Sequence, residues 1–348
     1  MKLNRRQLAT AGAAAFAGIA GGAWWLTRED EPKGASSQID LVAGAYAGDP
    51  HTSMPDLLAM LSITGGMPKR TNLILRLFDL EGVSLGVGSK PLVSITNLIS
   101  GEVSTDITLV EKDDHWQLDQ SAVDGNGWWQ VAVIVDDLTA IWTFMLPDPN
   151  LTGLDTPPKV ETDPQAEAML AAALDVLTQR TSLRWWEWLS GGNASIILAQ
   201  FSVTTPASNG QPDSFENRSL MAGRIPLDGT APTFRDEELR SVTVGDTAVS
   251  ITGAGTPAPS TPTTYLPISE YDTTYAGYDG VHFGTTTRIN DVDCQLVAFH
   301  LPGITPAWFA FWIETESLTL RELFMHSVNH YMHWVYFDID EPFVLSLT

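Results

Sequence analysis

The alternation of large apolar residues is clearest near the end of the chain, in residues 306–342. On an extended segment, one face carries Trp308, Ala310 and Trp312. The other face carries Phe309, Phe311 and Ile313. This is the spacing of a strand with apolar side chains on both faces. Polar residues at 314–317 and 327–329 predict turns around two further strands, at 318–326 and 331–337. Three aromatic-rich strands in succession predict an antiparallel meander whose aromatic face needs a cover, either a helix or a ligand.

The first half of the chain shows the same two-residue period in shorter segments. Residues 71–78 alternate, and Asp79-Leu80-Glu81-Gly82 predicts a hairpin turn after them. Gly, Asn and Asp separate the segments at the spacing of a small antiparallel β-sandwich. Further strands are expected at residues 91–98, 107–109, 115–118, 128–135 and 140–146.

A helical period replaces the strand period after residue 162. Thr162 or Asp163 is the expected N-cap, with Pro164 in the first turn. The apolar stripe of this helix is the natural cover for the aromatic meander, and it comprises Met169, Leu170, Ala173, Leu174 and Leu177. A second short helix is expected over residues 183–189 (LRWWEWL), ended by Gly191-Gly192.

The strand period returns from residue 195 to the end. Strands are expected at 195–204, at 241–245 paired with 248–251, and at 281–289 paired with 294–300. Residues 205–213 and the proline- and threonine-rich residues 256–264 are expected to be loops.

These patterns divide the chain into an ordered series of parts. The expected fold class is mainly β with an α+β second domain. The predicted parts are an export signal or membrane anchor (1–27), a tether (28–37), a β-sandwich (38–150), a proline-containing linker (151–162) and a helix-covered antiparallel sheet (163–348).

Charge and cysteine content narrow the possible partners. The 348 residues include 19 basic and 42 acidic side chains, for a net charge of -23. Nucleic acid and anionic membrane surfaces are therefore not expected as partners, because they carry the same sign. Cys294 is the single cysteine, so no intrachain disulfide and no thiolate cluster is expected, and its apolar surroundings predict a buried core residue.

The first 27 residues have the pattern of an export segment. Lys2, Arg5 and Arg6 precede an uncharged run from Ala9 to Leu26. The Arg5-Arg6 pair resembles a twin-arginine translocation signal, although Asn4 stands where that signal usually has serine or threonine. Both a cleaved signal and a retained anchor fit this segment. The rest of the chain is expected outside the cytoplasm.

The sequence has no G-x-S-x-G, HExxH, P-loop or dinucleotide-binding motif, so neither an enzyme nor a cofactor is expected.

Candidate metal ligands occur in both halves of the chain. The cluster of soft metal ligands in the first half comprises His51, Met54, Met60 and Met67. In the last strands, His326 and His330 meet at most across a turn, whereas His330 and His333 point to opposite faces of a strand. These are weak candidates for a metal site.

The expected β-sandwich at residues 38–150 resembles, over about 110 residues, the immunoglobulin-like extracytoplasmic domains of the YtkA or FixH type. The similar features are the strand LILRLFD after Thr71-Asn72, the strand VSITNL, the segment GNGWWQVAVIV and LPDPNLTG at the end. Domains of this type occur near copper-handling membrane proteins. The resemblance therefore implies an immunoglobulin-like β-sandwich and, as one alternative, a role in copper homeostasis.

The second half, from about Asp163 to the end, resembles the LolA-like family of envelope proteins, which includes mycobacterial-type lipoproteins that carry acylated lipids. The similar segments, in order, are NDVDC, WIETE, LTLR, HYM and YFD. The resemblance implies an antiparallel half-barrel closed by helices around an apolar cavity, and hence a lipid or other hydrophobic ligand. The candidate lining residues are Phe201, Phe283, Trp308, Trp312, Trp334 and Tyr336.

The sequence thus predicts a membrane-associated, extracytoplasmic, non-enzymatic binding protein for a lipid or other hydrophobic ligand. Two alternatives stay open at this point. One is a metal-homeostasis accessory protein, which requires His and Met side chains to converge around residues 51–67 or 326–333. The other is a sensor or scaffold that binds another envelope protein through an exposed apolar patch.

Overall fold

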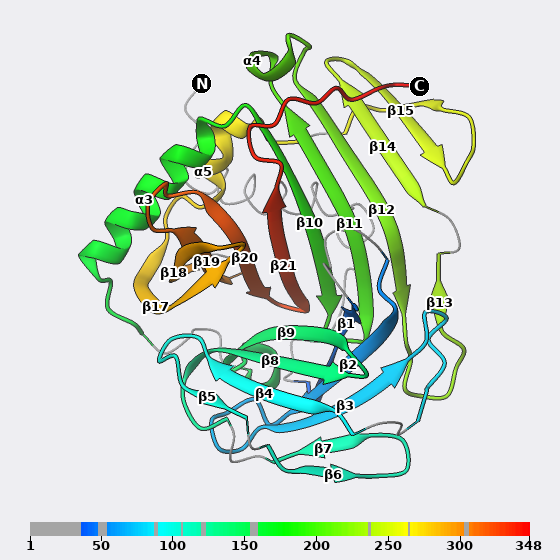
Figure 1. Cartoon of the computed structure of the whole chain (residues 1–348), viewed down its shortest axis with the longest axis vertical. Helices are drawn as coiled ribbons and strands as arrows, with labels where there is room; N and C mark the ends of the chain where they lie inside the picture. The colour runs from blue at the N-terminus through cyan, green and yellow to red at the C-terminus, as the bar shows by residue number, and fades with distance from the viewer. Residues whose placement is uncertain are drawn as a thin grey trace.

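The computed structural model shows a protein built from antiparallel sheets, with a small sandwich packed against one large sheet (Figure 1). It describes residues 36–47, 54–86, 90–105, 107–119, 123–153, 159–235, 238–263, 265–302 and 306–348. The export segment and His51 lie outside these residues. No helix in the described ranges is both long and apolar enough to cross a membrane.

The first part of the chain forms a sandwich of two antiparallel sheets, in the strand orders β1-β2-β3-β7-β6 and β5-β4-β8-β9. Its core lies between the sheets and contains Trp116, Trp129 and Phe144. The strands are β1 (Gln38–Ala45), β2 (Leu57–Thr64), β3 (Asn72–Phe78), β4 (Leu92–Asn97), β5 (Val103–Ser104), β6 (Leu109–Glu111), β7 (Trp116–Leu118), β8 (Gly127–Val135) and β9 (Leu138–Leu146).

The rest of the chain forms a 12-stranded antiparallel sheet, here called the large sheet. Its order is β16-β15-β14-β12-β11-β10-β21-β20-β19-β18-β17, and β13 pairs with β12. The strands are β10 (Ser182–Gly191), β11 (Ser195–Thr204), β12 (Ser214–Arg224), β13 (Thr233–Phe234), β14 (Leu239–Val244), β15 (Thr247–Thr252), β16 (Ala258–Ser260), β17 (Asp279–Ile289), β18 (Val292–Leu301), β19 (Ala307–Glu314), β20 (Leu320–Ser327) and β21 (His330–Phe337).

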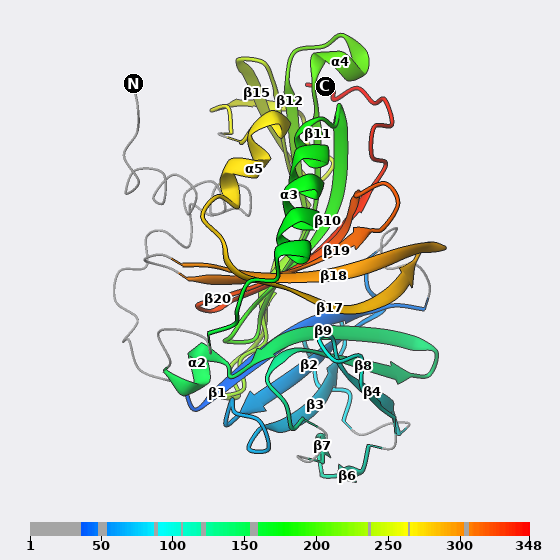
Figure 2. The same cartoon turned by 90° about the vertical axis from the view of Figure 1, so that its left-hand side faces the viewer.

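One face of the large sheet, here called the inner face, is covered by helices (Figure 2). The main cover is α3 (Pro164–Thr178), which begins at Asp163, whose carboxylate accepts a hydrogen bond from the backbone of Gln165. Leu170, Leu174 and their neighbours on α3 pack among the aromatic side chains of the sheet, as the sequence predicted. The remaining helical segments are α2 (Pro149–Thr152), α4 (Pro206–Asn209), η2 (Ile268–Glu270) and α5 (Tyr271–Thr274).

The opposite face of the large sheet, here called the outer face, is covered by the sandwich. Val42 and Met60 of the sandwich pack against Trp186 of β10. Trp128 packs in a second cluster with Trp308, and Cys294 is buried there as expected. Backbone hydrogen bonds also join Asp40 of β1 to the turn between β10 and β11. The sandwich and the large sheet therefore share continuous apolar cores.

The main disagreement with the sequence prediction concerns residues 183–189, which form part of strand β10 and not a helix. Nearly every residue of this strand is buried, because α3 covers one face and the sandwich covers the other. Strands buried on both faces lose the alternating pattern. Gly191 is the last residue of β10, and Gly192 begins the turn to β11.

Smaller differences concern segments whose pattern was weak. Strands β2 and β12 were not predicted, and the segment expected to be a loop at 256–264 contains β16. The loop expected at 205–213 contains the short helix α4. The meander of β19, β20 and β21 and the hairpins β14–β15 and β17–β18 agree with the predictions.

Candidate functional site

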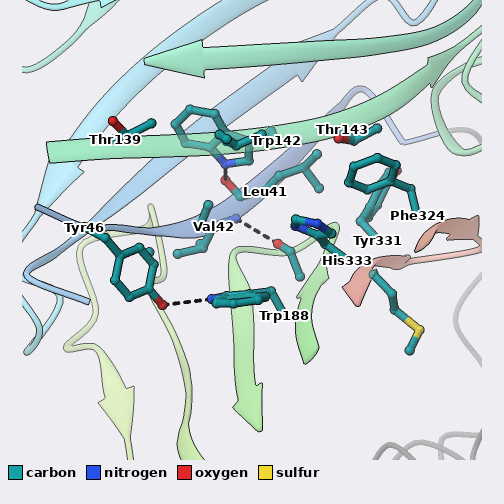
Figure 3. Close-up of a pocket in the computed structure, with 15 residues that line it drawn as sticks. Leu41, Val42, Tyr46, Thr139, Trp142, Thr143, Trp188, Phe324, Tyr331 and His333 are labelled. Atoms are coloured by element: carbon teal, nitrogen blue, oxygen red, sulfur yellow. Dashed lines mark hydrogen bonds between the residues drawn. The ribbon is translucent and has the colours of Figure 1, made fainter. Parts of the chain in front are cut away.

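A pocket of about 350 Å³ lies between the sandwich and the outer face of the large sheet. The sandwich contributes residues of β1 and β9, together with Tyr46. The large sheet contributes residues of β10, β20 and β21. Figure 3 shows the side chains of both parts facing one another across this space. The pocket therefore depends on how the two parts of the chain pack together.

The floor of the pocket consists of planar side chains on three neighbouring strands. His333 on β21 is the direct partner of Trp188 on β10 and of Phe324 on β20. The ring centroids of Trp188 and His333 are 5.7 Å apart, and those of Phe324 and His333 are 4.6 Å apart. Alternation along each strand puts all three rings on the outer face. The result is a row of rings that runs across the strands.

The opposite wall comes from the sandwich. Val42 of β1 lies above the floor, and the β9 residues Thr139, Ile141 and Thr143 line the same side. Ile141 is 40% exposed, so the pocket has access to solvent beside β9. β1 is held in place by its backbone, because the Val42 N–H donates to the Ser190 hydroxyl at 2.8 Å.

One end of the pocket is formed by Tyr46 (Figure 3). Its hydroxyl accepts a hydrogen bond from the indole N–H of Trp188 at 3.0 Å, and the two rings meet edge to face. Gly44 makes this position of the tyrosine possible. A Cβ atom there would lie 2.7 Å from Pro55 and 2.9 Å from the Tyr46 ring. Burial raises the pKa of Tyr46, so its hydroxyl stays protonated.

The other end carries Thr143, Phe324 and Tyr331 (Figure 3). The Thr143 hydroxyl oxygen is buried and has no hydrogen-bond partner among the described residues. A buried polar atom without a partner is costly, so this hydroxyl is suited to a ligand group or a water molecule. The lining includes His333 but no Lys, Arg, Asp or Glu.

A buried polar network adjoins this end of the pocket and joins the two parts of the chain. Asp148, the N-cap of α2, accepts hydrogen bonds from two backbone N–H groups and from the Tyr331 hydroxyl at 3.2 Å. The Asn150 amide donates to the Tyr331 hydroxyl at 2.9 Å and lies 3.2 Å from His326 Nε2. Tyr331 therefore contributes to both the pocket wall and the network.

Burial shifts the pKa values of the titratable groups in the network towards their uncharged forms. Burial raises the pKa of Asp148 to about 7, against the opposing effect of its three donors. Burial lowers the pKa of His326 to about 3. His326 Nε2 and Asp148 Oδ2 are 3.7 Å apart, too far for a direct hydrogen bond. Its hydrogen bonds join α2 to β20 and β21, so we assign the network a structural role.

The predicted lining residues are divided between the two faces of the large sheet. Phe201, Trp334 and Tyr336 lie on the inner face under α3, and Phe283 packs against that cluster. Trp185 stacks on Phe201 at 5.1 Å and also contacts Trp334 and Tyr336. These inner rings are buried against one another. A ligand under α3 would have to displace some of them.

Trp308 and Trp312 do not share that face, which corrects the prediction that all six residues line one cavity. Both lie on the outer face and pack against sandwich residues, including Trp128 and Met145. The prediction treated aromatic residues as one set, although Trp308 and Phe309 must point to opposite faces of β19.

The candidate metal ligands do not converge. Met60 is fully buried in the core, whereas Met54 and Met67 are more than a third exposed. His326 is buried in the network on the outer face, and alternation along β21 directs His330 to the other face. The expected meeting of His326 and His330 across the turn is therefore wrong. Among the described residues, no group of three or more His, Cys, Asp or Glu side chains is arranged to hold a metal ion.

The residues that form the pocket were not identified from the sequence. Trp188 was assigned to a helix, and Tyr46, Thr143 and Phe324 received no role. Trp188 and Phe324 lie on strands of the large sheet that are covered on both faces, so the alternation that would mark a pocket-facing side chain is lost there. Sequence alone does not indicate which strands of two sheets lie opposite each other.

Comparisons with solved structures give distant likenesses. LppX, a lipoprotein of Mycobacterium tuberculosis, shares 13% identity at a TM-score of 0.37, covering 53% of this chain and 100% of that chain. LprF of Mycobacterium bovis shares 11% identity at a TM-score of 0.41, covering 53% of this chain and 98% of that chain. A LolA superfamily protein of Nitrosomonas europaea shares 9% identity at a TM-score of 0.24, covering 52% of this chain and 94% of that chain.

The chain matches no family model and no curated protein sequence. At these identities and TM-scores, the likeness to the solved structures does not transfer a ligand or a role to this chain.

Proposed function

We propose that this protein is a non-enzymatic binding protein for a small hydrophobic ligand, held between the sandwich and the large sheet. The proposal is carried by one observation, the apolar pocket of about 350 Å³ with walls from both parts of the chain. Small-molecule sites are typically concave and apolar, contain a few placed polar groups, and often lie at domain interfaces. This pocket has each of these properties.

The polar groups of the pocket suit recognition better than catalysis. Tyr46 stays protonated, and the Ser190 hydroxyl accepts from the backbone of β1. His333 Nε2 pairs with Glu322 at 3.0 Å. A catalytic site needs a nucleophile in contact with a base. The Ser190 hydroxyl is hydrogen-bonded to backbone groups and the Thr143 hydroxyl has no partner among the described residues, so neither is hydrogen-bonded to the His333–Glu322 pair.

Two further parts of the proposal come from the sequence. The export-like segment at residues 1–27 supports a place outside the cytoplasm, attached to the membrane or released from it. The LolA-like resemblance supports a lipid or similar molecule as the ligand. The inner-face residues Phe201, Phe283, Trp334 and Tyr336 remain a second proposed lining for a lipid, provided that their packed rings move apart.

Native mass spectrometry of the full chain purified from its own host tests the proposal. We expect an additional mass that organic solvent removes. The variant Thr143→Phe should lose most of this mass, because a phenyl ring at position 143 would occupy the pocket. Thr287→Phe is the matched control, since Thr287 is exposed on β17, away from the pocket.

Three results would contradict the proposed site. A bare protein that takes up no apolar probe would remove the function itself. A bound mass that both variants retain would place the ligand elsewhere, with the inner face as the next site to test. A bare protein that gains copper or zinc on titration would instead support metal handling.

A further inference from the structure

We infer that the pocket between the sandwich and the large sheet selects an uncharged, planar aromatic molecule of about two fused rings with one hydroxyl or carbonyl group. The inference rests on the proposed function, because it names the class of hydrophobic ligand that the same pocket takes. Four properties of the pocket carry it: the shape of its floor, its volume, its lack of charge and the position of its hydroxyl groups.

The floor favours an aromatic ring over a flexible chain. The rings of Trp188, His333 and Phe324 lie in register on three neighbouring strands, and neighbouring rings are tilted by 33° and 36° to one another, so they present both edges and faces to a ligand ring. Three strands span about 10 Å at the usual spacing, which matches the length of two fused rings. Aromatic pairs contribute about 0.5–1.5 kcal/mol beyond the area they bury. An acyl chain gains no such term and loses more rotational freedom on binding.

The volume sets the size of the ligand. A space of about 350 Å³ equals the share of roughly a dozen water molecules in the liquid. A bicyclic ring with one substituent fits within this space, whereas a lipid with several chains exceeds it.

The electrostatics favour a neutral molecule. No Lys or Arg lines the pocket, so an anion would find no opposite charge and would also meet a protein of net charge -23. No Asp or Glu lines it either, and nearby Glu322 already pairs with His333. A desolvated ion of either sign would therefore lack a partner.

The two ends of the pocket offer hydrogen bonds to a ligand substituent. The Tyr46 hydroxyl accepts from Trp188 and retains its own O–H to donate. At the other end, the buried Thr143 hydroxyl has no partner among the described residues. Either group can bind a hydroxyl or carbonyl at the edge of a ring that lies on the floor.

Isothermal titration calorimetry of the full chain with four probes tests the inference. 1-Naphthol has the inferred ring, size and hydroxyl group. Naphthalene lacks the hydroxyl, 1-naphthoate is an anion of similar shape, and 1-decanol is a flexible chain of similar size. We expect 1-naphthol to bind at least about tenfold more tightly than 1-decanol or 1-naphthoate, and several-fold more tightly than naphthalene.

Three variants locate the binding. Trp188→Ala should weaken 1-naphthol by roughly three- to tenfold, while Trp188→Phe, which keeps a ring, should weaken it less. Thr143→Phe should abolish binding of every probe, and the control Thr287→Phe should leave it unchanged. Thermal melting of each variant identifies any that fails to fold. If Thr143→Phe fails to fold, the comparison of Trp188→Ala with Trp188→Phe still tests whether the ring at position 188 contributes to binding.

The outcomes separate the inference from the proposed function. If no probe binds, both are overturned. If 1-decanol binds as tightly as 1-naphthol and Thr143→Phe removes it, the hydrophobic site stands and the planar ligand class is wrong. Equal binding of 1-naphthoate overturns the requirement for a neutral ligand. Tight 1-naphthol binding that survives Thr143→Phe places the ring outside this pocket and overturns the inference.

Discussion

Glu187 is a single buried side chain that makes the stability of the whole fold depend on pH. It lies on β10, is fully buried, and faces Trp334, its partner on β21. Burial raises the pKa of Glu187 to about 8, with the Trp334 indole acting in the opposite direction. A folded-state pKa above the ordinary value means that the folded protein binds the proton more tightly than the unfolded chain. The acid is therefore protonated in the folded state at neutral pH.

This predicts a loss of stability as pH rises. The contribution of Glu187 is complete below its ordinary pKa of 4.5 and is lost as pH rises from there through about 8. Each unit of the pKa difference corresponds to about 1.4 kcal/mol in the free energy of unfolding. We expect Glu187→Gln, which cannot ionise, to show a flatter decline in Tm between about pH 5 and pH 8.

Differential scanning calorimetry of both proteins across this range measures the effect. The matched control is Glu270→Gln, since Glu270 is exposed and near the same cluster. The plot of Tm against pH for Glu270→Gln should run parallel to that of the unmodified protein. Parallel curves for Glu187→Gln as well would show that Glu187 does not bind its proton more tightly in the folded state.

At the scale of the residue, the site prediction grouped side chains that the structure divides between two faces of the large sheet. The alternation of Trp308 and Phe309 was visible in the sequence, and so was the aromatic character of both faces. What the sequence did not indicate was that the sandwich covers the face of Trp308 while α3 covers that of Phe309. The surroundings of each ring depend on which part of the chain packs over its face of the sheet. That packing is set by contacts between residues that are far apart in the chain.

At the scale of the element, α3 is a clear case of prediction from local signals. Asp163 caps the helix, Pro164 occupies its first turn and the apolar stripe faces the sheet. Each signal lies within a few residues of the others, so no long-range contact was needed to read it. β10 is the opposite case, because burial on both faces removed the period that identifies a strand.

The cover that α3 provides can be tested by truncating one buried side chain. Leu170 is fully buried on the helix and packs in the aromatic cluster of the inner face. Leu170→Ala should reduce the free energy of unfolding by about 2–5 kcal/mol, through lost apolar contact and a residual cavity. Gln165→Ala, at an exposed position of the same helix, is the control and should change it by less than about 0.5 kcal/mol. Urea denaturation monitored by tryptophan fluorescence measures both, and similar small changes would mean that the helix is not packed on the sheet.

At the scale of the whole molecule, the junction between the sandwich and the large sheet determines both the shape of the pocket and part of the stability. The two apolar clusters on the outer face join the parts broadly, and the network of Asp148, Asn150, His326 and Tyr331 joins them at one point. None of this arrangement was predicted. The sequence separated the chain into parts but contains no local signal for how two sheets face each other.

Asp148 and His326 should make opposite contributions to the pH dependence of stability. The pKa of Asp148 is raised to about 7, so its contribution to stability is lost as pH rises from 3.8 through about 7. The pKa of His326 is lowered to about 3, so its contribution is lost as pH falls from 6.5 towards 3. The junction is therefore expected to be strongest in the mildly acidic range between these limits.

Tyr331→Phe tests this junction directly. The substitution removes the hydroxyl that donates to Asp148 and accepts from Asn150, and it should cost about 1–3 kcal/mol in the free energy of unfolding. The cost should be larger at pH 8.5 than at pH 5.5, because a donor matters most when the Asp148 carboxyl is ionised.

Thermal melting at both pH values measures the cost, and hydrogen exchange of residues 148–153 and 326–331 reports whether the loss is local to the junction. Tyr278→Phe, at a partly exposed tyrosine near α5, serves as the control and should show a smaller change that does not depend on pH. An equal loss for Tyr331→Phe at the two pH values would mean that the hydroxyl does not stabilise the ionised carboxyl. In that case the apolar clusters, and not the network, would be what holds the two walls of the pocket at their observed separation.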